Sequence, residues 1–167
     1  MNGIDYKHDD GGRLAAGFKG HTGDCVTRAI AIATGIDYEK VRKDLMQRQS
    51  DWRSTGSRKA KRQTGNSVRN GCHKEVYEPY LAALGWQKQS LIKFGCSKRV
   101  KMTADDLPSG KLIAKVQSGR RGHLAAIVDH VLHDNWDCRE SFLYENNMIT
   151  TKRIPKTVVA IWTKPNE

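Results

Sequence analysis

The chain has 167 residues, of which 38% are hydrophobic and 28% are charged, and its formal net charge is +11 at pH 7. This length predicts one domain with a core of its own, over residues 1–167. No apolar run approaches the ~18 residues that a membrane-spanning helix needs, and residues 1–12 lack the apolar region of a secretory signal. We therefore expect a cytoplasmic protein with no membrane partner.

The four cysteines are far apart in the sequence and form no closely spaced pair. A small disulfide scaffold would carry cysteines more densely, and a structural zinc site usually brings its ligands in close pairs. We therefore expect neither a metal ion nor another cofactor. The cysteines are Cys25, Cys72, Cys96 and Cys138.

The first half of the chain indicates loops and helices. Residues 1–20 are rich in glycine and without periodicity, which predicts a loose lead-in. A helix is expected over residues 25–34, because Thr22 or Asp24 can cap its start and Gly35 can end it. Further helices are expected over residues 37–49, with Asp37 as N-cap and Val41 and Leu45 on its apolar side, and within residues 73–86.

A basic segment separates the second and third of these helices. From Arg53 to Lys74 the chain has seven lysines and arginines and no acidic residue, interleaved with serine, threonine, glycine and asparagine. This composition predicts a flexible loop over residues 53–72. Its charge also suits contact with nucleic acid or an acidic protein. The candidate contacts are Arg58, Lys59, Lys61, Arg62 and Arg69.

The second half of the chain indicates strands. Apolar or alternating stretches predict strands at residues 90–95, 111–117, 123–129, 130–136 and 157–162. Helices followed by strands predict an α+β fold, with N-terminal helices packed on a C-terminal sheet that is largely antiparallel.

One predicted hairpin brings a histidine and a carboxylate together. A two-residue turn at residues 129–130 places His123 opposite Trp136, with Asp134 as a diagonal neighbour on the same face. A turn at residues 128–129 would place His123 directly opposite Asp134. Only a three-residue turn would separate the two onto different faces. The sequence therefore predicts that His123, Asp134 and Trp136 lie on one face, where a carboxylate can accept a hydrogen bond from the His123 ring.

Cys25 is either a buried core thiol or a nucleophile at the start of a helix. Free cysteines are commonly buried and inert. A helix N-terminus favours the thiolate, and Arg28 could add positive charge on nearly the same side. Asp134 could fix the tautomer of His123 and leave its other ring nitrogen for the thiol. With a one-residue register slip, Asn135 would take that place.

The order of these residues resembles the papain-like cysteine peptidases, in which a cysteine begins a helix, a histidine begins a strand, and an Asn-Ser-Trp motif follows. "Asp134-Asn135-Trp136" is similar to that motif, and "Asp24-Cys25" with its helix is similar to bacteriocin-processing peptidases of the same clan. More closely, "DCVTRAIAIATGIDYEKVRKDL", "YLAALGW" and "GHLAAIVDHVLHDNWDC" resemble small papain-like proteins of bacteriophages and bacterial mobile elements. The resemblance covers most of residues 20–140.

The resemblance implies a papain-like fold and a role for each matching residue. Cys25 would be the nucleophile, His123 the general base and acid, and Asp134 the orienting residue. The family usually takes an oxyanion donor from a glutamine about six residues before the cysteine, where this chain has Lys19. Lys19 or His21 could donate instead, as could Thr22. Trp136 would shield the His123–Asp134 pair from water, and its indole is expected mainly in the core.

Two functions are expected from this sequence. The first is a phage-type thiol hydrolase, a peptidase, isopeptidase or amidase, that acts on a protein or peptide of the host. The alternative is a catalytically silent papain-like binding module that uses the basic loop to contact nucleic acid or a host protein.

Overall fold

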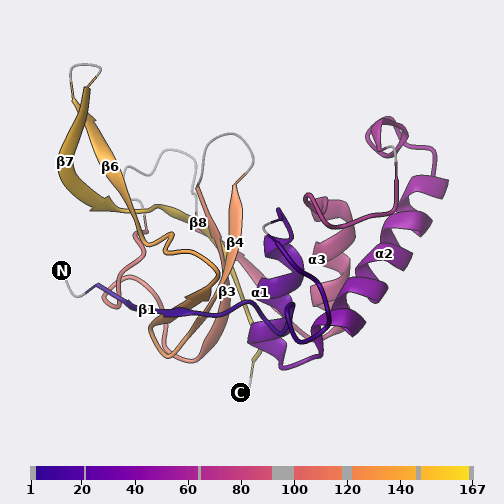
Figure 1. Cartoon of the computed structure of the whole chain (residues 1–167), viewed down its shortest axis with the longest axis horizontal. Coiled ribbons are helices and arrows are strands. Elements are labelled where there is room, and N and C mark those ends of the chain that lie inside the picture. The colour runs from indigo at the N-terminus through magenta and orange to yellow at the C-terminus, as the bar shows by residue number, and fades with distance from the viewer. Residues whose placement is uncertain are drawn as a thin grey trace.

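The computed structural model describes residues 3–20, 22–63, 65–91, 100–117, 122–145 and 148–165; for residues 142–145 and 148–152 it describes the backbone alone. The described chain is α+β, with helices α1 (Cys25–Thr34), α2 (Tyr38–Ser54) and α3 (Lys74–Ala83) on one side of a mixed sheet (Figure 1). A short 3-10 helix, η1 (Ala60–Arg62), lies between α2 and α3. No helix in the described part is long and apolar enough to cross a membrane.

The main sheet has six strands in the order β1-β5-β4-β3-β8-β2. Strand β1 runs parallel to β5, and the other neighbours are antiparallel. The prediction of an α+β fold with helices before most strands is confirmed at this level, and the sheet is mixed. The strands are β1 (Asp5–His8), β2 (Gln87–Ser90), β3 (Lys111–Val116), β4 (His123–Val128), β5 (Val131–Asp134) and β8 (Val158–Thr163).

The two faces of the sheet bury separate clusters of side chains. On one face the helices pack on alternate strand residues such as Leu124 and Ala126. On the other face Ala125, Ile127 and Leu132 pack with residues of the 100–107 segment and with Cys138. This two-sided burial explains why β4 is apolar along almost its whole length, rather than alternating.

Two of the predicted local signals set helix boundaries, the end of α1 and the start of α2. Gly35 adopts a left-handed φ of 72° and donates its N–H to Ala31, which ends α1 as expected. The Asp37 carboxylate accepts the Lys40 backbone N–H at 3.0 Å, which caps α2. Helix α2 runs to Ser54, five residues beyond the predicted end at residue 49.

The β4–β5 hairpin has the predicted two-residue turn. Val128 pairs with Val131, so the register is the one that places His123 and Asp134 on the same face. Asp129 and His130 have φ values of 48° and 61°, the left-handed pair that a type I′ turn requires. This turn fixes the position of the candidate site.

Residues 1–20 differ from the predicted loose lead-in. Residues 5–8 form the edge strand β1, and Arg13 is buried. The sequence signal was weak because β1 is mostly exposed and lacks an apolar alternation. A second, two-stranded sheet of β6 (Glu140–Glu145) and β7 (Met148–Pro155) was likewise not predicted. The predicted strand at 90–95 lies largely outside the described residues, and β2 ends at Ser90.

The basic segment is anchored to the core at two points. Helix α2 includes its first residues, and η1 occupies its middle. Ala60 and Val68 are buried, and Val68 belongs to the cluster beneath the helices. The segment predicted as a loop over residues 53–72 is therefore partly helical, and Ala60 and Val68 attach its backbone to the core.

Candidate active site

A cleft of about 1100 Å³ opens at the start of α1. It is lined by Cys25 and by residues from three other parts of the chain. One wall comes from the basic segment and the start of α3, and another comes from β3, β4 and the loop after β5. The cleft brings Cys25, His123, Asn135 and Trp136 together with the basic residues Lys59, Arg62, Lys74 and Lys115.

Cys25 occupies the first position of α1 and is half-buried. Burial by itself raises the pKa of the Cys25 thiol. This effect is outweighed by a hydrogen bond and positive charge from His123, by the backbone N–H of Leu124 and by the charge of Arg28. The pKa of Cys25 is therefore held below the ordinary value for cysteine, and the thiolate is favoured.

His123 is held between this thiol and a buried carboxylate. Its Nε2 atom hydrogen-bonds to Oδ2 of Asp134. Burial would lower the pKa of His123, but contacts with Asp134, Cys138 and Cys25 raise it overall. The pKa values of His123 and Cys25 thus move in opposite directions, which favours an imidazolium beside a thiolate. With Nε2 occupied by Asp134, Nδ1 is the ring nitrogen that remains for proton transfer.

The thiol and the imidazole meet at the end of the sheet. Along β4, His123 lies on the same face as Ala125 and Ile127, which face away from the helices. Helix α1 packs on the opposite face, through Leu124. His123 is the first residue of β4, so it can reach the start of α1 past the strand end.

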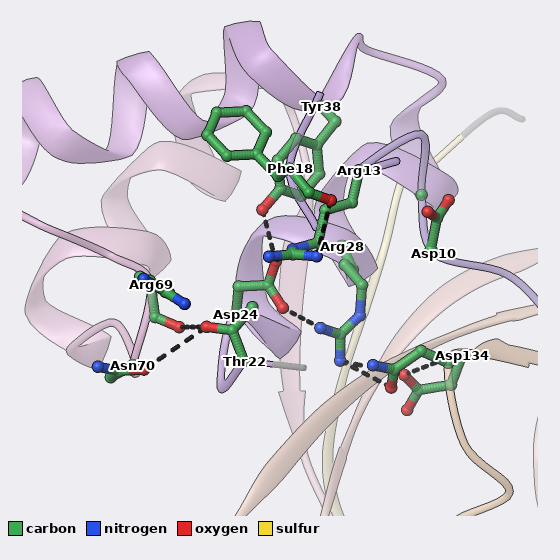
Figure 2. Close-up of polar contacts among 12 residues, drawn as sticks. Asp10, Arg13, Phe18, Thr22, Asp24, Arg28, Tyr38, Arg69, Asn70 and Asp134 are labelled. Atoms are coloured by element: carbon green, nitrogen blue, oxygen red, sulfur yellow. Dashed lines mark hydrogen bonds and ion pairs between the residues drawn. The ribbon is translucent and has the colours of Figure 1, made fainter. Parts of the chain in front are cut away.

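Arg28 connects α1 to the carboxylate behind His123 (Figure 2). Its Nη1 atom donates to Oδ1 of Asp24, the residue that directly precedes the helix. Its Nη2 atom lies 3.3 Å from Oδ1 of Asp134 and 3.1 Å from Oδ1 of Asn135. Arg28 is only 3% exposed, and both aspartates are 2% exposed. Asp134 thus accepts from His123 on one oxygen and faces a guanidinium at the other.

Asp24 is the N-cap residue of α1, but its side chain makes no capping hydrogen bond. Its second oxygen accepts from the Tyr38 hydroxyl and lies 3.1 Å from Nε of Arg13. Arg13 also donates to the backbone carbonyls of Phe18, Lys19 and Gly20, at 2.7–3.0 Å. The Asp24 carboxylate is therefore bonded to Tyr38 and to two arginines, Arg13 and Arg28, which balance its charge (Figure 2).

The structure places the predicted supporting residues in different surroundings. Trp136 was expected mainly in the core, but it is 43% exposed on the cleft, with its ring centroid 5.2 Å from that of His123. Asn135 accepts from Arg28 and is not the residue bonded to His123. Lys19 is exposed and does not line the described cleft. His21 lies outside the described residues. The Thr22 hydroxyl donates to the Arg69 carbonyl at 2.5 Å.

The predicted nucleic-acid contacts divide into two groups. All five are exposed: Arg58, Lys59, Lys61, Arg62 and Arg69. Lys59 and Arg62 line the cleft that contains Cys25, whereas the other three do not. Lys59 forms a 2.8 Å ion pair with Glu75 at the start of α3.

Two further cysteines lie close to the site, and sequence reasoning assigned them no role. Cys72 lines the cleft, where burial and the charge of Cys25 raise its pKa to about 12. The Cys138 sulfur lies 3.9 Å from Oδ2 of Asp134. No local pattern in the sequence indicates these contacts, because they depend on how the loops before α3 and after β5 close. Cys96 lies outside the described residues.

The side chains of His123, Asp134 and Cys138 offer metal-ligating atoms within 4.8 Å of one another. Arg28 already forms an ion pair with Asp134, and its positive charge would repel a metal cation bound at this carboxylate. These residues therefore suit an internal hydrogen-bonded group better than a metal centre, and the absence of a metal stays a prediction.

The arrangement combines an acidified thiol, a basic imidazole and a buried carboxylate beside an open cleft. These are the groups that nucleophilic attack on a carbonyl requires. A comparison with family models, curated proteins and solved structures finds no match for this chain.

Proposed function

We propose that this protein is a papain-like thiol hydrolase that acts on an amide or isopeptide bond. The observation that carries the proposal is the placement of Cys25 and His123 on one cleft, with Asp134 hydrogen-bonded to Nε2 of His123. The pKa of Cys25 is lowered and that of His123 is raised in this arrangement, which agrees with the proposal. A merely buried thiol would have its pKa raised instead, because burial disfavours the charged form.

In the proposed reaction, the Cys25 thiolate attacks the carbonyl carbon of the substrate. His123 then gives its proton to the departing amine, and a thioester forms on Cys25. His123 next accepts a proton from a water molecule, which attacks the thioester and frees the acid and the thiol. Asp134 holds the imidazole in one orientation through both steps.

The same residues support three outcomes that differ in the leaving group and the acceptor. Ammonia leaves in deamidation, a peptide amine leaves in proteolysis, and a second amine replaces water in acyl transfer. From the resemblance to proteins of bacteriophages, we propose a protein or peptide of the host cytoplasm as the substrate.

Acylation by p-nitrophenyl acetate tests this function without knowledge of the natural substrate. The wild-type protein should release p-nitrophenolate in a burst followed by steady turnover, with transient acetylation of Cys25 in the mass spectrum. Cys25→Ala should lose both, whereas Cys72→Ala, which removes a thiol of the same cleft, should keep both. Stable acetyl-Cys25 without turnover, or unchanged release by Cys25→Ala, would contradict the proposal.

The exposed cations of the basic segment favour a second candidate, a binding module without turnover. Nucleic-acid binding that weakens steeply with salt and survives Cys25→Ala would support this candidate. The three cations outside the cleft, Arg58, Lys61 and Arg69, should then contribute as much to nucleic-acid affinity as Lys59 and Arg62.

A further inference from the structure

The side chains that line the cleft carry an unbalanced positive charge. Lys59, Arg62, Lys74 and Lys115 are here called the cleft cations. Glu75 is the only carboxylate among the described lining residues, and Lys59 already pairs with it. Its pKa is lowered chiefly by this hydrogen bond, so it stays ionised. Arg28 also lines the cleft, but its positive charge is balanced by ion pairs with Asp24 and Asp134.

The cleft cations come from separate walls. Arg62 and Lys74 belong to the basic segment and the start of α3, and neither forms an ion pair with another described residue. Lys115 lies on β3, where it pairs with Leu124, the neighbour of His123. A substrate that reaches Cys25 therefore passes positive charge from two directions.

From this charge distribution we infer that the substrate is an acidic polypeptide segment, with carboxylates flanking the bond that Cys25 attacks. The inference rests on the proposed function, and in it the basic segment recognises the substrate. The negative charge of nucleic acid would also complement the cleft cations. Its backbone, however, contains phosphodiesters and offers no amide carbonyl to a thiol hydrolase, whereas acidic side chains accompany the amide bond in a polypeptide.

The basic segment contains its own matched control. Arg58 and Arg62 are both exposed arginines four residues apart, but only Arg62 lines the cleft. Arg62→Gln and Arg58→Gln remove the same charge from the protein. A general effect of net charge would therefore appear in both variants, and a cleft effect only in the first.

Alkylation of Cys25 by a charged and a neutral reagent measures the cleft charge at the thiol. Iodoacetate is an anion and iodoacetamide is neutral, so the ratio of their rates at Cys25 reports the local potential. We expect this ratio to fall about threefold in Arg62→Gln and in Lys115→Gln at low ionic strength. High salt should reduce the difference, and Arg58→Gln should stay close to the wild type.

The outcomes separate this inference from the proposed function. Fast alkylation of Cys25 with an unchanged ratio in Arg62→Gln and Lys115→Gln would overturn the inference and leave the proposed function standing. If neither reagent alkylates Cys25 faster than Cys72, the proposed function fails and the inference fails with it.

Protection of Cys25 from iodoacetamide then identifies the class of polyanion. A glutamate-rich peptide should slow alkylation, a glutamine peptide of equal length should not, and Arg62→Gln should weaken the protection. Protection by a single-stranded oligonucleotide but not by the acidic peptide would overturn the inference in favour of nucleic acid.

Discussion

Cys25 and Cys72 line the same cleft, yet their surroundings shift the two thiol pKa values in opposite directions. Both lie at or just before the start of a helix, and burial raises the pKa of each. Cys25 has an imidazole, a backbone N–H donor and a guanidinium nearby, whereas Cys72 has the negative charge of Cys25. The comparison shows that the partners of a buried thiol, rather than its burial or helix position, separate a candidate nucleophile from an inert residue.

The largest expected effect comes from removing Arg28, the buried cation beneath Cys25. Arg28→Met leaves Asp134 with His123 as its remaining cationic partner and leaves Asp24 with one of its two arginines. Because two buried ion pairs are broken, we expect a loss of about 3–5 kcal/mol in unfolding free energy. Lys40→Met breaks an exposed pair of the same i,i+4 spacing, with Asp44, and should cost about 0.5 kcal/mol.

Urea unfolding of the two variants and the wild type measures both losses. Equal small losses in Arg28→Met and Lys40→Met would mean that the network around Arg28 does not stabilise the site.

The second prediction concerns the reactivity of the two thiols, Cys25 and Cys72. Near neutral pH, we expect iodoacetamide to alkylate Cys25 at least about a hundredfold faster than Cys72, because their thiolate fractions differ by several powers of ten. Mass spectrometry of peptides from one sample gives both rates. Alkylation of the two residues at similar rates, or only after unfolding, would remove the distinction between them.

The third prediction concerns a variant in which the pKa of the Cys25 thiol should rise, as that of Cys72 does. His123→Gln removes the imidazolium and leaves burial to raise the pKa of Cys25. The thiolate fraction near neutral pH should then fall tenfold or more, since each pKa unit is a factor of ten. The alkylation rate of Cys25 should fall with it, while that of Cys72 stays slow. A Cys25 rate unchanged by His123→Gln would show that the imidazole does not activate the thiol.

The smallest expected effect concerns Trp136, whose indole lies beside the His123 ring. A cation next to an exposed aromatic ring gains about 0.5–1 kcal/mol. Trp136→Ala should therefore raise the pH midpoint of Cys25 alkylation by less than one unit. The midpoint is the measurement to use, because better access to the cleft would change the rate but not the midpoint. A shift as large as that of His123→Gln would assign the indole a greater role.

Local signals predicted the parts of the site that lie within one helix or one hairpin. The Asp129–His130 turn fixes the register that joins His123 to Asp134, and Gly35 ends the helix that Cys25 begins. Strands β3, β4, β5 and β8 were predicted from stretches that are either apolar throughout or alternating. The prediction that His123 and Asp134 lie on one face is confirmed, and the two side chains are hydrogen-bonded.

The missed features depend on contacts between distant segments. Nothing near Arg28 in the sequence indicates that it reaches Asp134, 106 residues later. The parallel strand β1 lacks an apolar face, and Trp136 is apolar without being buried. The basic segment lines the cleft because Val68 is buried and Thr22 bonds to Arg69. A single valine in a polar loop gives too little signal to predict that placement.

The most direct test of the central claim is a titration of the Cys25 thiolate. The ultraviolet absorbance of the thiolate, taken as the difference between the wild type and Cys25→Ser, gives its pKa. We predict a step with a midpoint below the ordinary cysteine value of about 8.5, with loss of this step in His123→Gln. A midpoint at or above that value would contradict the account, because Cys25 would then be a buried thiol like Cys72.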